Sequence, residues 1–223
     1  MSAGRDNLSQ REYRRGLRCL TRLLRVRLLA MLIAETDRTV LRHFHVADLD
    51  AMADVFGDAE VMRFGPGPQP REWVEKWLKG CLEDYYQKWG FGLWAVVHKP
   101  NWAVIGFCGL SLFDDIDGRR EIEIGYRLAP DYWGQGLATE AARAVRDHAL
   151  GQLALRRLIA LIDAENIRSI RVAEKIGLRH EKDTMFRDKP VRVYAIRSSD
   201  LLSIDGNRLG QICPGMITTP VAK

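Results

Sequence analysis

The segment Glu121–Leu150 constrains the fold of this 223-residue chain more than any other part. Alternating apolar and polar residues run to Leu128, which is the pattern of a half-buried strand. Pro130 ends that strand, glycines follow at Gly134 and Gly136, and good helix formers come next. A glycine turn before a helix leaves the first N–H groups of the helix unpaired, and such groups attract phosphate. The segment predicts a strand, an anion-binding loop and a helix.

Residue periodicity predicts further helices and strands on both sides of this segment. The predicted strands are 39–45, 93–98, 104–113, 121–128, 157–162, 179–186 and 191–197, and the predicted helices are 46–56, 71–89, 137–150 and 167–176. Short turns separate the three strands between 93 and 128, which we expect to form an antiparallel meander. We therefore expect one domain of the α+β class with a mixed sheet.

The positive charge of the chain lies at its N-terminus. Residues 1–30 contain eight Arg and two acidic residues, so the rest of the chain carries a net charge of −1 out of the total of +5. We therefore expect no nucleic-acid binding by the folded domain, and only the Arg-rich leader could provide it. Leucines at helical spacing in this leader predict a basic amphipathic helix. We expect a leader over 1–34, a folded domain over 35–202 and a C-terminal tail over 203–223.

The cysteines and the apolar runs exclude several classes of protein. Cys19, Cys81, Cys108 and Cys213 are far apart, which argues against zinc and redox motifs, so we expect no metal site. No apolar run is long enough to span a membrane, and the run 28–34 lacks the cleavage site of a signal peptide. A cytoplasmic location is expected.

The loop Tyr132–Thr139, with the sequence YWGQGLAT, resembles the Q/R-x-x-G-x-G/A pyrophosphate loop of the GNAT superfamily of acetyltransferases. Trp133 replaces the usual first Arg or Gln, and this form is similar to the RimJ/RimL-type N-terminal acetyltransferases of ribosomal proteins. The segments ETDRTVLR, DAEVMRF, EIEIGYRL and ENIRSIRVAEKIGL also resemble that subgroup. The resemblance implies a strongly twisted mixed sheet of about seven strands, with helices on both faces and a splay between two central parallel strands.

The resemblance also implies that acetyl-CoA lies in this splay, between strands 121–128 and 157–162. The backbone of Leu128 would donate a hydrogen bond to the pantetheine arm. Asn166 would contact the pantetheine amide through its side chain, with Ser169 as a weaker candidate, although Asn166 equally fits the N-cap of the next helix. The predicted pyrophosphate site consists of Trp133, Gly134, Gln135, Gly136, Leu137, Ala138 and Thr139.

Transfer of an acetyl group to an amine requires a base that removes the amine proton. Glu121 and Glu123 project from one face of their strand, and the family pattern favours Glu123 as the catalytic base. Burial would raise its pKa into a useful range, whereas a salt bridge to Arg127 or Arg143 would make it structural.

The group that protonates the leaving thiolate has no candidate at its usual place. Many members of the superfamily have Tyr or Ser seven residues after the Asn, where this chain has Ala173. Water, Ser169 or Tyr132 could substitute, whereas His148 and His180 fit structural roles better.

The resemblance implies a primary amine as the acceptor, either a protein N-terminal α-amine or a small-molecule amine. Aminoglycoside or polyamine acetylation would require an acidic cleft, to which Glu83, Asp84 and the run Asp114, Asp115 and Asp117 could contribute. A non-catalytic acetyl-CoA-binding module is the alternative outside enzymes. The subgroup often forms homodimers.

Overall fold

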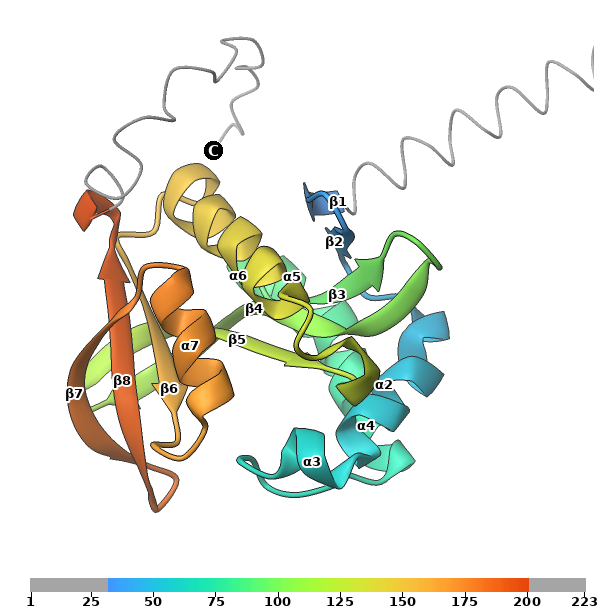
Figure 1. Ribbon diagram of the computed structural model, residues 1–223, viewed down its shortest axis with the longest axis horizontal. Helices are drawn as coiled ribbons and strands as arrows, with labels where there is room; N and C mark the ends of the chain where they lie inside the picture. Colours follow the sequence, from blue (N-terminus) through green and yellow to red (C-terminus); the bar gives the residue numbers. More distant parts are fainter. Residues whose placement is uncertain (1–31, 201–223) are drawn as a thin grey trace, which may run out of the picture.

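We analysed a computed structural model of the chain, which describes residues 32–200 (Figure 1). The predicted leader helix and the C-terminal tail lie outside the described residues. Within the described part, no helix is both long enough and apolar enough to cross a membrane.

One mixed sheet of eight strands, in the order β1-β2-β3-β4-β5-β6-β8-β7, forms the centre of the molecule. The strands are β1 (Leu32–Glu35), β2 (Thr39–Arg42), β3 (Leu93–His98), β4 (Ala103–Ile116), β5 (Arg119–Leu128), β6 (Arg157–Ile162), β7 (Arg179–Phe186) and β8 (Lys189–Arg197). All neighbours are antiparallel except β5 and β6, which are parallel. The predicted meander is confirmed as β3, β4 and β5, and the α+β class is confirmed as well.

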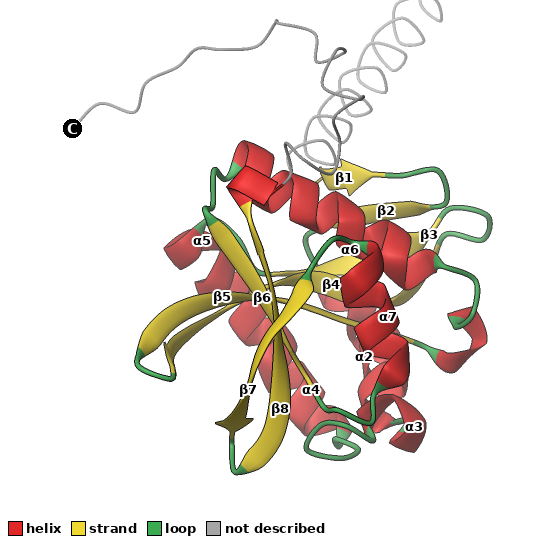
Figure 2. Cartoon of the chain, turned by 60° about the vertical axis from the view of Figure 1, so that its left-hand side comes forward, coloured by secondary structure: helices red, strands yellow, loops and turns green. Residues whose placement is uncertain are grey.

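Helices cover both faces of this sheet (Figures 1 and 2). They are η1 (Val46–Asp48), α2 (Leu49–Gly57), α3 (Ala59–Met62), α4 (Arg71–Gly80), η2 (Cys81–Tyr85), α5 (Tyr86–Trp89), η3 (Pro130–Tyr132), α6 (Leu137–Asp147), η4 (His148–Gln152) and α7 (Ile167–Lys175). The helices α6 and α7 pack on the face that carries Trp94, Ile124 and Leu128, whereas α2 and α4 pack on the face that carries Ala95 and Phe107. Because side chains alternate along a strand, the two faces have separate apolar cores.

The structure differs from the sequence-based expectation in several places. The strand predicted over 39–45 ends at Arg42, because the Asp48 carboxylate binds the Arg42 guanidinium and the His45 N–H and so turns the chain. The sheet has eight strands rather than about seven, since Leu32–Glu35 adds an edge strand. This strand is short and pairs irregularly with β2, so its sequence carries no clear periodic signal. The helix predicted over 71–89 contains a π-helical turn at Cys81–Tyr85.

The buried face of α4 lies before the π-helical turn. Val74, Leu78 and Cys81 are buried in the core, whereas Trp73 is 39% exposed. Trp77 packs edge-on against Phe56 in the core below it.

Candidate active site

The parallel strands β5 and β6 separate immediately after one point of pairing. Their register contains the single pair Glu123 and Ile159. Beyond this pair, the N–H of Leu161 on β6 is 3.4 Å from the Glu123 carboxylate, so a side chain reaches across where a strand backbone would otherwise pair. The expected splay is therefore present, with Glu123 at its closed end.

The main chain of Leu128 points into this splay. Leu128 is opposite Gly106 on β4, and the next residue, Ala129, donates to the Ile105 carbonyl at 2.8 Å. In an antiparallel pair the bonded positions alternate, so the N–H and carbonyl of Leu128 face β6 instead of β4. The Leu128 carbonyl accepts the Trp133 indole N–H at 2.6 Å, which leaves the N–H as the group that faces the splay.

The loop after β5 has the backbone that its glycines predict. Gly134 and Gly136 have φ angles of +73° and +81°, in the left-handed region where a Cβ is unfavourable. Gly136 is also the N-cap of α6. The first hydrogen bond of that helix runs from the Glu140 N–H to the Gly136 carbonyl.

A row of main-chain N–H groups is therefore unpaired at the start of α6. Within residues 32–200, the N–H groups from Gly134 through Thr139 donate to no main-chain acceptor. Leu137 is buried in the core, so only its backbone faces outward. Unpaired N–H groups at a helix start, with no Cβ at the two glycines, fit a pyrophosphate.

Trp133 explains how the loop is held without the usual Arg or Gln. Its indole binds the end of β5, and the guanidinium of Arg168, in the first turn of α7, lies 4.8 Å from its ring centroid. Gln135 donates from its side chain to the Asp131 carbonyl at 2.8 Å. Side chains thus close the loop on itself and against α7.

Asn166 is the N-cap of α7, which was one of the two roles predicted for it, beside the contact to the pantetheine amide. Its Oδ1 accepts from the Ser169 N–H at 3.1 Å, and the Ser169 carbonyl accepts from the Tyr126 hydroxyl at 2.9 Å. The cap uses the amide oxygen of Asn166, so its NH₂ group can still serve a ligand.

Glu123 is half-buried at the closed end of the splay. Burial raises the pKa of Glu123 to about 7, although the Leu161 N–H and the positive charges of Arg127 and Arg187 oppose this rise. A carboxylate with a pKa near neutral pH is suited to general base catalysis.

The alternatives for these carboxylates resolve clearly. Glu121 is paired with Arg157, which also binds Glu181, and is therefore structural. Neither guanidinium considered for Glu123 binds it, because Arg127 donates to the Val61 carbonyl and Arg143 to the Lys175 carbonyl.

Ala173 is fully buried in the core, so position 173 offers no acid. The Tyr132 hydroxyl accepts from Asn101 at the β3–β4 turn and keeps its own proton, so Tyr132 stays a candidate acid. His148 packs edge-on against Trp94, and His180 is paired with Asp183 on the surface, as their structural interpretation predicts.

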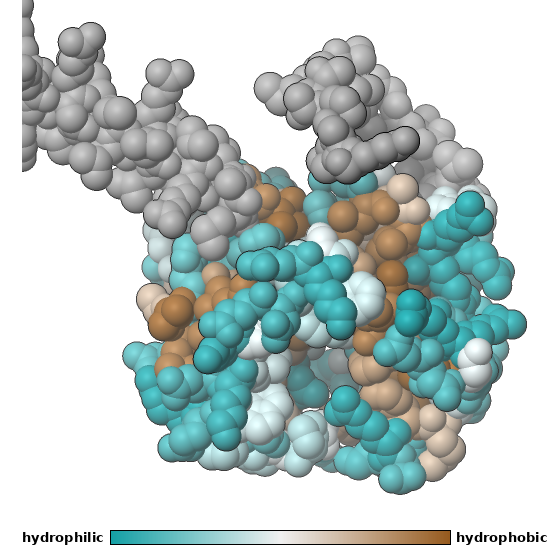
Figure 3. Space-filling view, turned by 180° about the vertical axis from the view of Figure 1, so that it is seen from behind, coloured by the Kyte–Doolittle hydropathy of each residue, from teal (hydrophilic) through white to brown (hydrophobic). Residues whose placement is uncertain are grey.

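A cleft of about 820 Å³ lies on the Glu123 side of the sheet. Ser111, which lines this cleft, is directly opposite Glu123 in the β4–β5 register, so the two side chains share one face. Figure 3, which views the molecule from behind, shows a hollow bordered by apolar and polar side chains. The charged and aromatic residues that line the cleft are Lys76, Trp77, Glu83, Asp84, Tyr85, Lys88, Trp89, Phe113 and Arg187.

The acidic run at the β4–β5 turn does not line this cleft. Asp114 binds Arg120, Asp115 accepts from the Gly118 N–H, and Asp117 binds Lys182. Only Glu83 and Asp84 of the carboxylates considered reach the lining.

Cys81 lines the cleft, although no sequence pattern predicts a cysteine near the acceptor. Burial raises the pKa of its thiol to about 12, so the thiol stays protonated at neutral pH. A protonated thiol is a poor nucleophile, which argues against a covalent acetyl-cysteine.

Sequence comparison identifies the family of this chain. Residues 38–179 match the family described as "Acetyltransferase (GNAT) domain". The Bacillus subtilis protein YkkB is 36% identical over 168 residues, which cover 73% of this chain and 94% of YkkB. Spermidine N(1)-acetyltransferase of Escherichia coli strain K12 is 35% identical over 153 residues, which cover 67% of this chain and 73% of that enzyme.

Solved structures agree with this assignment. A GNAT-family acetyltransferase from Bacillus anthracis superposes with a TM-score of 0.64 and 26% identity, covering 76% of this chain and 99% of that structure. The chain therefore belongs to the GNAT family of acetyltransferases, enzymes that use acetyl-CoA as the acetyl donor.

Proposed function

We propose that this chain transfers the acetyl group of acetyl-CoA to a primary amine by direct attack in a ternary complex. The observation that supports this most is the position of Glu123, which lies at the closed end of the splay and beside Ser111 of the cleft. A base between a donor site and an acceptor site is the arrangement that direct transfer requires.

Each side of the site then has a role. The N–H groups at the start of α6 hold the pyrophosphate, and the Leu128 N–H and the Asn166 amide hold the pantetheine arm. When bound, acetyl-CoA supplies an activated thioester. Glu123 accepts the proton of the amine, directly or through a water, and water protonates the thiolate because Ala173 offers no group.

A protein N-terminal α-amine is our first candidate for the acceptor. The YWGQGLAT loop is similar to that of the RimJ/RimL subgroup, which acetylates ribosomal proteins. The cleft lining carries three cations, Lys76, Lys88 and Arg187, against two carboxylates, Glu83 and Asp84. This balance disfavours an acceptor with several positive charges.

A polyamine is the second candidate, because one relative is a spermidine acetyltransferase. Aminoglycosides are polycations of the same electrostatic class. A homodimer stays a prediction from the family resemblance, and a cytoplasmic location stays a prediction from the apolar runs of the sequence.

The decisive experiment measures release of CoA thiol from acetyl-CoA with a panel of amines. The panel contains N-terminal peptides of ribosomal proteins, spermidine, and an aminoglycoside. We expect turnover with at least one peptide. Tight binding of acetyl-CoA without turnover on any amine would favour a non-catalytic module instead.

Glu123→Gln tests the base within this assay. General base catalysis contributes about 10²–10⁴-fold, so kcat is expected to fall by that factor while the Kd for CoA stays unchanged. Glu174→Gln, at an exposed carboxylate on α7, is the matched control and should leave kcat unchanged. Full activity of Glu123→Gln would remove Glu123 from this role.

A further inference from the structure

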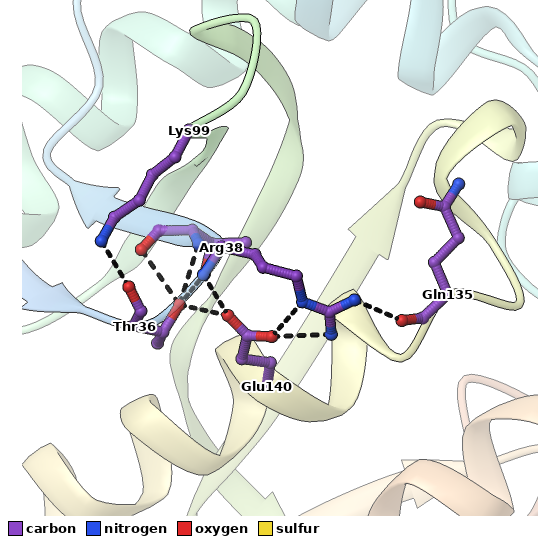
Figure 4. Close-up of polar contacts among 6 residues, drawn as sticks. Thr36, Arg38, Lys99, Gln135 and Glu140 are labelled. Atoms are coloured by element: carbon purple, nitrogen blue, oxygen red, sulfur yellow. Dashed lines mark hydrogen bonds and ion pairs between the residues drawn. The ribbon is translucent and has the colours of Figure 1, made fainter.

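The start of α6 carries a carboxylate that collects donors from one distant turn. Glu140 accepts from the Thr36 hydroxyl at 2.5 Å, from the Arg38 N–H at 2.8 Å and from Arg38 Nε at 2.8 Å. Arg38 Nη2 also lies 2.7 Å from Glu140 (Figure 4). The guanidinium therefore binds the carboxylate through two of its nitrogens, which fixes the orientation of both groups.

The third nitrogen of the same guanidinium reaches the glycine loop. Arg38 Nη1 donates to the Gln135 carbonyl at 2.9 Å (Figure 4). Gln135 stands between the two glycines with positive φ, which are the residues with the greatest conformational freedom in the loop. One planar side chain thus ties this carbonyl to the first turn of the helix that follows.

The turn that carries Arg38 is itself anchored. Thr36 and Thr39 are joined by their hydroxyls at 2.7 Å, and Thr39 is fully buried. Lys99, at the start of the β3–β4 turn, donates from its side chain to the Thr36 carbonyl and from its backbone to the Arg38 carbonyl. Arg38 therefore projects from a rigid part of the sheet edge.

The pair also solves an electrostatic problem. A carboxylate in the first turn of α6 lies near the N–H groups that fit a pyrophosphate, where it would repel phosphate charge. Burial would raise the pKa of Glu140, but hydrogen bonds from Thr36 and Arg38 together lower it, so Glu140 is ionised at neutral pH. Arg38 neutralises that negative charge.

We propose that Arg38 is a positioning residue for the acetyl donor. Acting through Gln135 and Glu140, it holds the loop Trp133–Gly136 in the shape that receives the pyrophosphate. This inference depends on the donor site proposed above and not on the identity of the acceptor.

The test measures the Kd for CoA by calorimetry and the hydrogen exchange of the loop amides in the free protein. Loss of one hydrogen bond to a charged group predicts that Arg38→Ala raises the Kd about tenfold. The Trp133 and Glu140 amides, which donate to the Pro130 and Gly136 carbonyls at the two ends of the loop, should exchange faster in the same variant, because Arg38 no longer holds the Gln135 carbonyl between them. Arg38→Lys keeps the charge but cannot span both partners, so it should fall between Arg38→Ala and the unmodified chain.

Arg120→Ala is the matched control, because Arg120 also binds a carboxylate, Asp114, through two nitrogens, but on the far β4–β5 hairpin. It should change neither quantity. An unchanged Kd in Arg38→Ala would overturn the proposal. A raised Kd with unchanged loop exchange would also overturn it, since Arg38 would then touch the donor directly.

Failure of the unmodified chain to bind CoA would overturn this inference together with the proposed function. Normal CoA binding without acetyl transfer would count against the proposed function alone. In that case, a raised Kd with faster loop exchange in Arg38→Ala would still support the positioning role.

Discussion

The two sides of the site are built from different kinds of chemical group. The donor side, which we define as the loop Tyr132–Thr139, the Leu128 N–H and Asn166, consists mainly of backbone N–H groups in a short span of sequence. The acceptor side, defined as the 820 Å³ cleft, consists of residues from α4, η2 and α5, from the strands β3 and β4, and from the β7–β8 turn. The backbone N–H groups of the donor side fit the pyrophosphate and the pantetheine arm, which are the same in every acetyl-CoA molecule. The side chains of the acceptor side can be substituted one at a time without a change in the backbone. The donor can therefore stay constant in this family while the acceptor varies.

The largest expected effect lies at Glu123, where the two sides meet. Only the ionised carboxylate accepts a proton, and the pKa of Glu123 is about 7. The rate is therefore expected to fall about tenfold for each pH unit below 7. Initial rates across neutral pH, at saturating acetyl-CoA, measure this. A flat profile between about pH 5 and pH 8 would mean that another group removes the proton.

Stability is expected to respond to pH with the opposite sign at this residue. The folded chain keeps the Glu123 proton between the ordinary pKa of 4.5 and about 7, whereas the unfolded chain loses it. The contribution of this group to stability is thus present below pH 4.5 and decreases as the pH rises to 7. Denaturant unfolding of the chain and of Glu123→Gln should show this slope only where Glu123 is present.

On the donor side, Gly136→Ala separates loop geometry from general stability. Its φ of +81° costs an alanine about 1 kcal/mol of stability, and the displaced N–H groups should raise the Kd for CoA about tenfold. Gly118→Ala introduces the same strain at a φ of +77° in the β4–β5 turn. It should lower stability equally and leave CoA binding intact. Equal effects of both variants on CoA binding would contradict a specific role for the loop.

A smaller effect on the Kd for CoA is expected at Asn166, whose side chain caps α7 and is also proposed to contact the ligand. Asn166→Ala removes the cap and should cost about 1 kcal/mol, whereas Asn166→Asp keeps the cap and the stability. Both variants lose the amide NH₂, so both should weaken CoA binding about threefold to tenfold. If Asn166→Asp bound CoA normally, Asn166 would be a cap alone.

The smallest effect is expected on the acceptor side. Asp84→Asn removes one of several charges around a wide cleft, so the KM of a cationic acceptor should rise about twofold to threefold. The Kd for CoA should not change. A change in CoA affinity would show that the two sides are less independent than their construction indicates.

Much of the donor side could be predicted from the sequence because its signals are local. Positive φ at Gly134 and Gly136, the cap at Asn166 and the helix at Leu137 each depend on a few neighbouring residues. The bounds of β3, β6 and β7 are the predicted ones, because each of these strands needed only its own periodicity. The roles of Arg38 and Glu140 stayed hidden because the two residues are 102 positions apart, and no periodicity relates them.

The acceptor side could be predicted only in part for the same reason. A helix over 71–89 could be predicted, but its π-helical turn at Cys81–Tyr85, which carries several of the lining residues, has no clear sequence signal. Arg187 reaches the cleft from the β7–β8 turn. The acidic run 114–117 forms ion pairs within its own hairpin, to Arg120, and with the adjoining hairpin, to Lys182. Both outcomes depend on tertiary packing.

The single pairing point between β5 and β6 has a mechanical consequence. It leaves five strands on one side and three on the other, joined edge to edge at Glu123 and Ile159. The molecule is in effect two half-sheets with a seam, and the Leu128 N–H lies along the open part of that seam. An extended ligand with alternating donors and acceptors fills such a seam as an additional strand would. Binding of the ligand would then complete the hydrogen bonding between the two half-sheets. Without the ligand, the two half-sheets are expected to separate most easily along this seam.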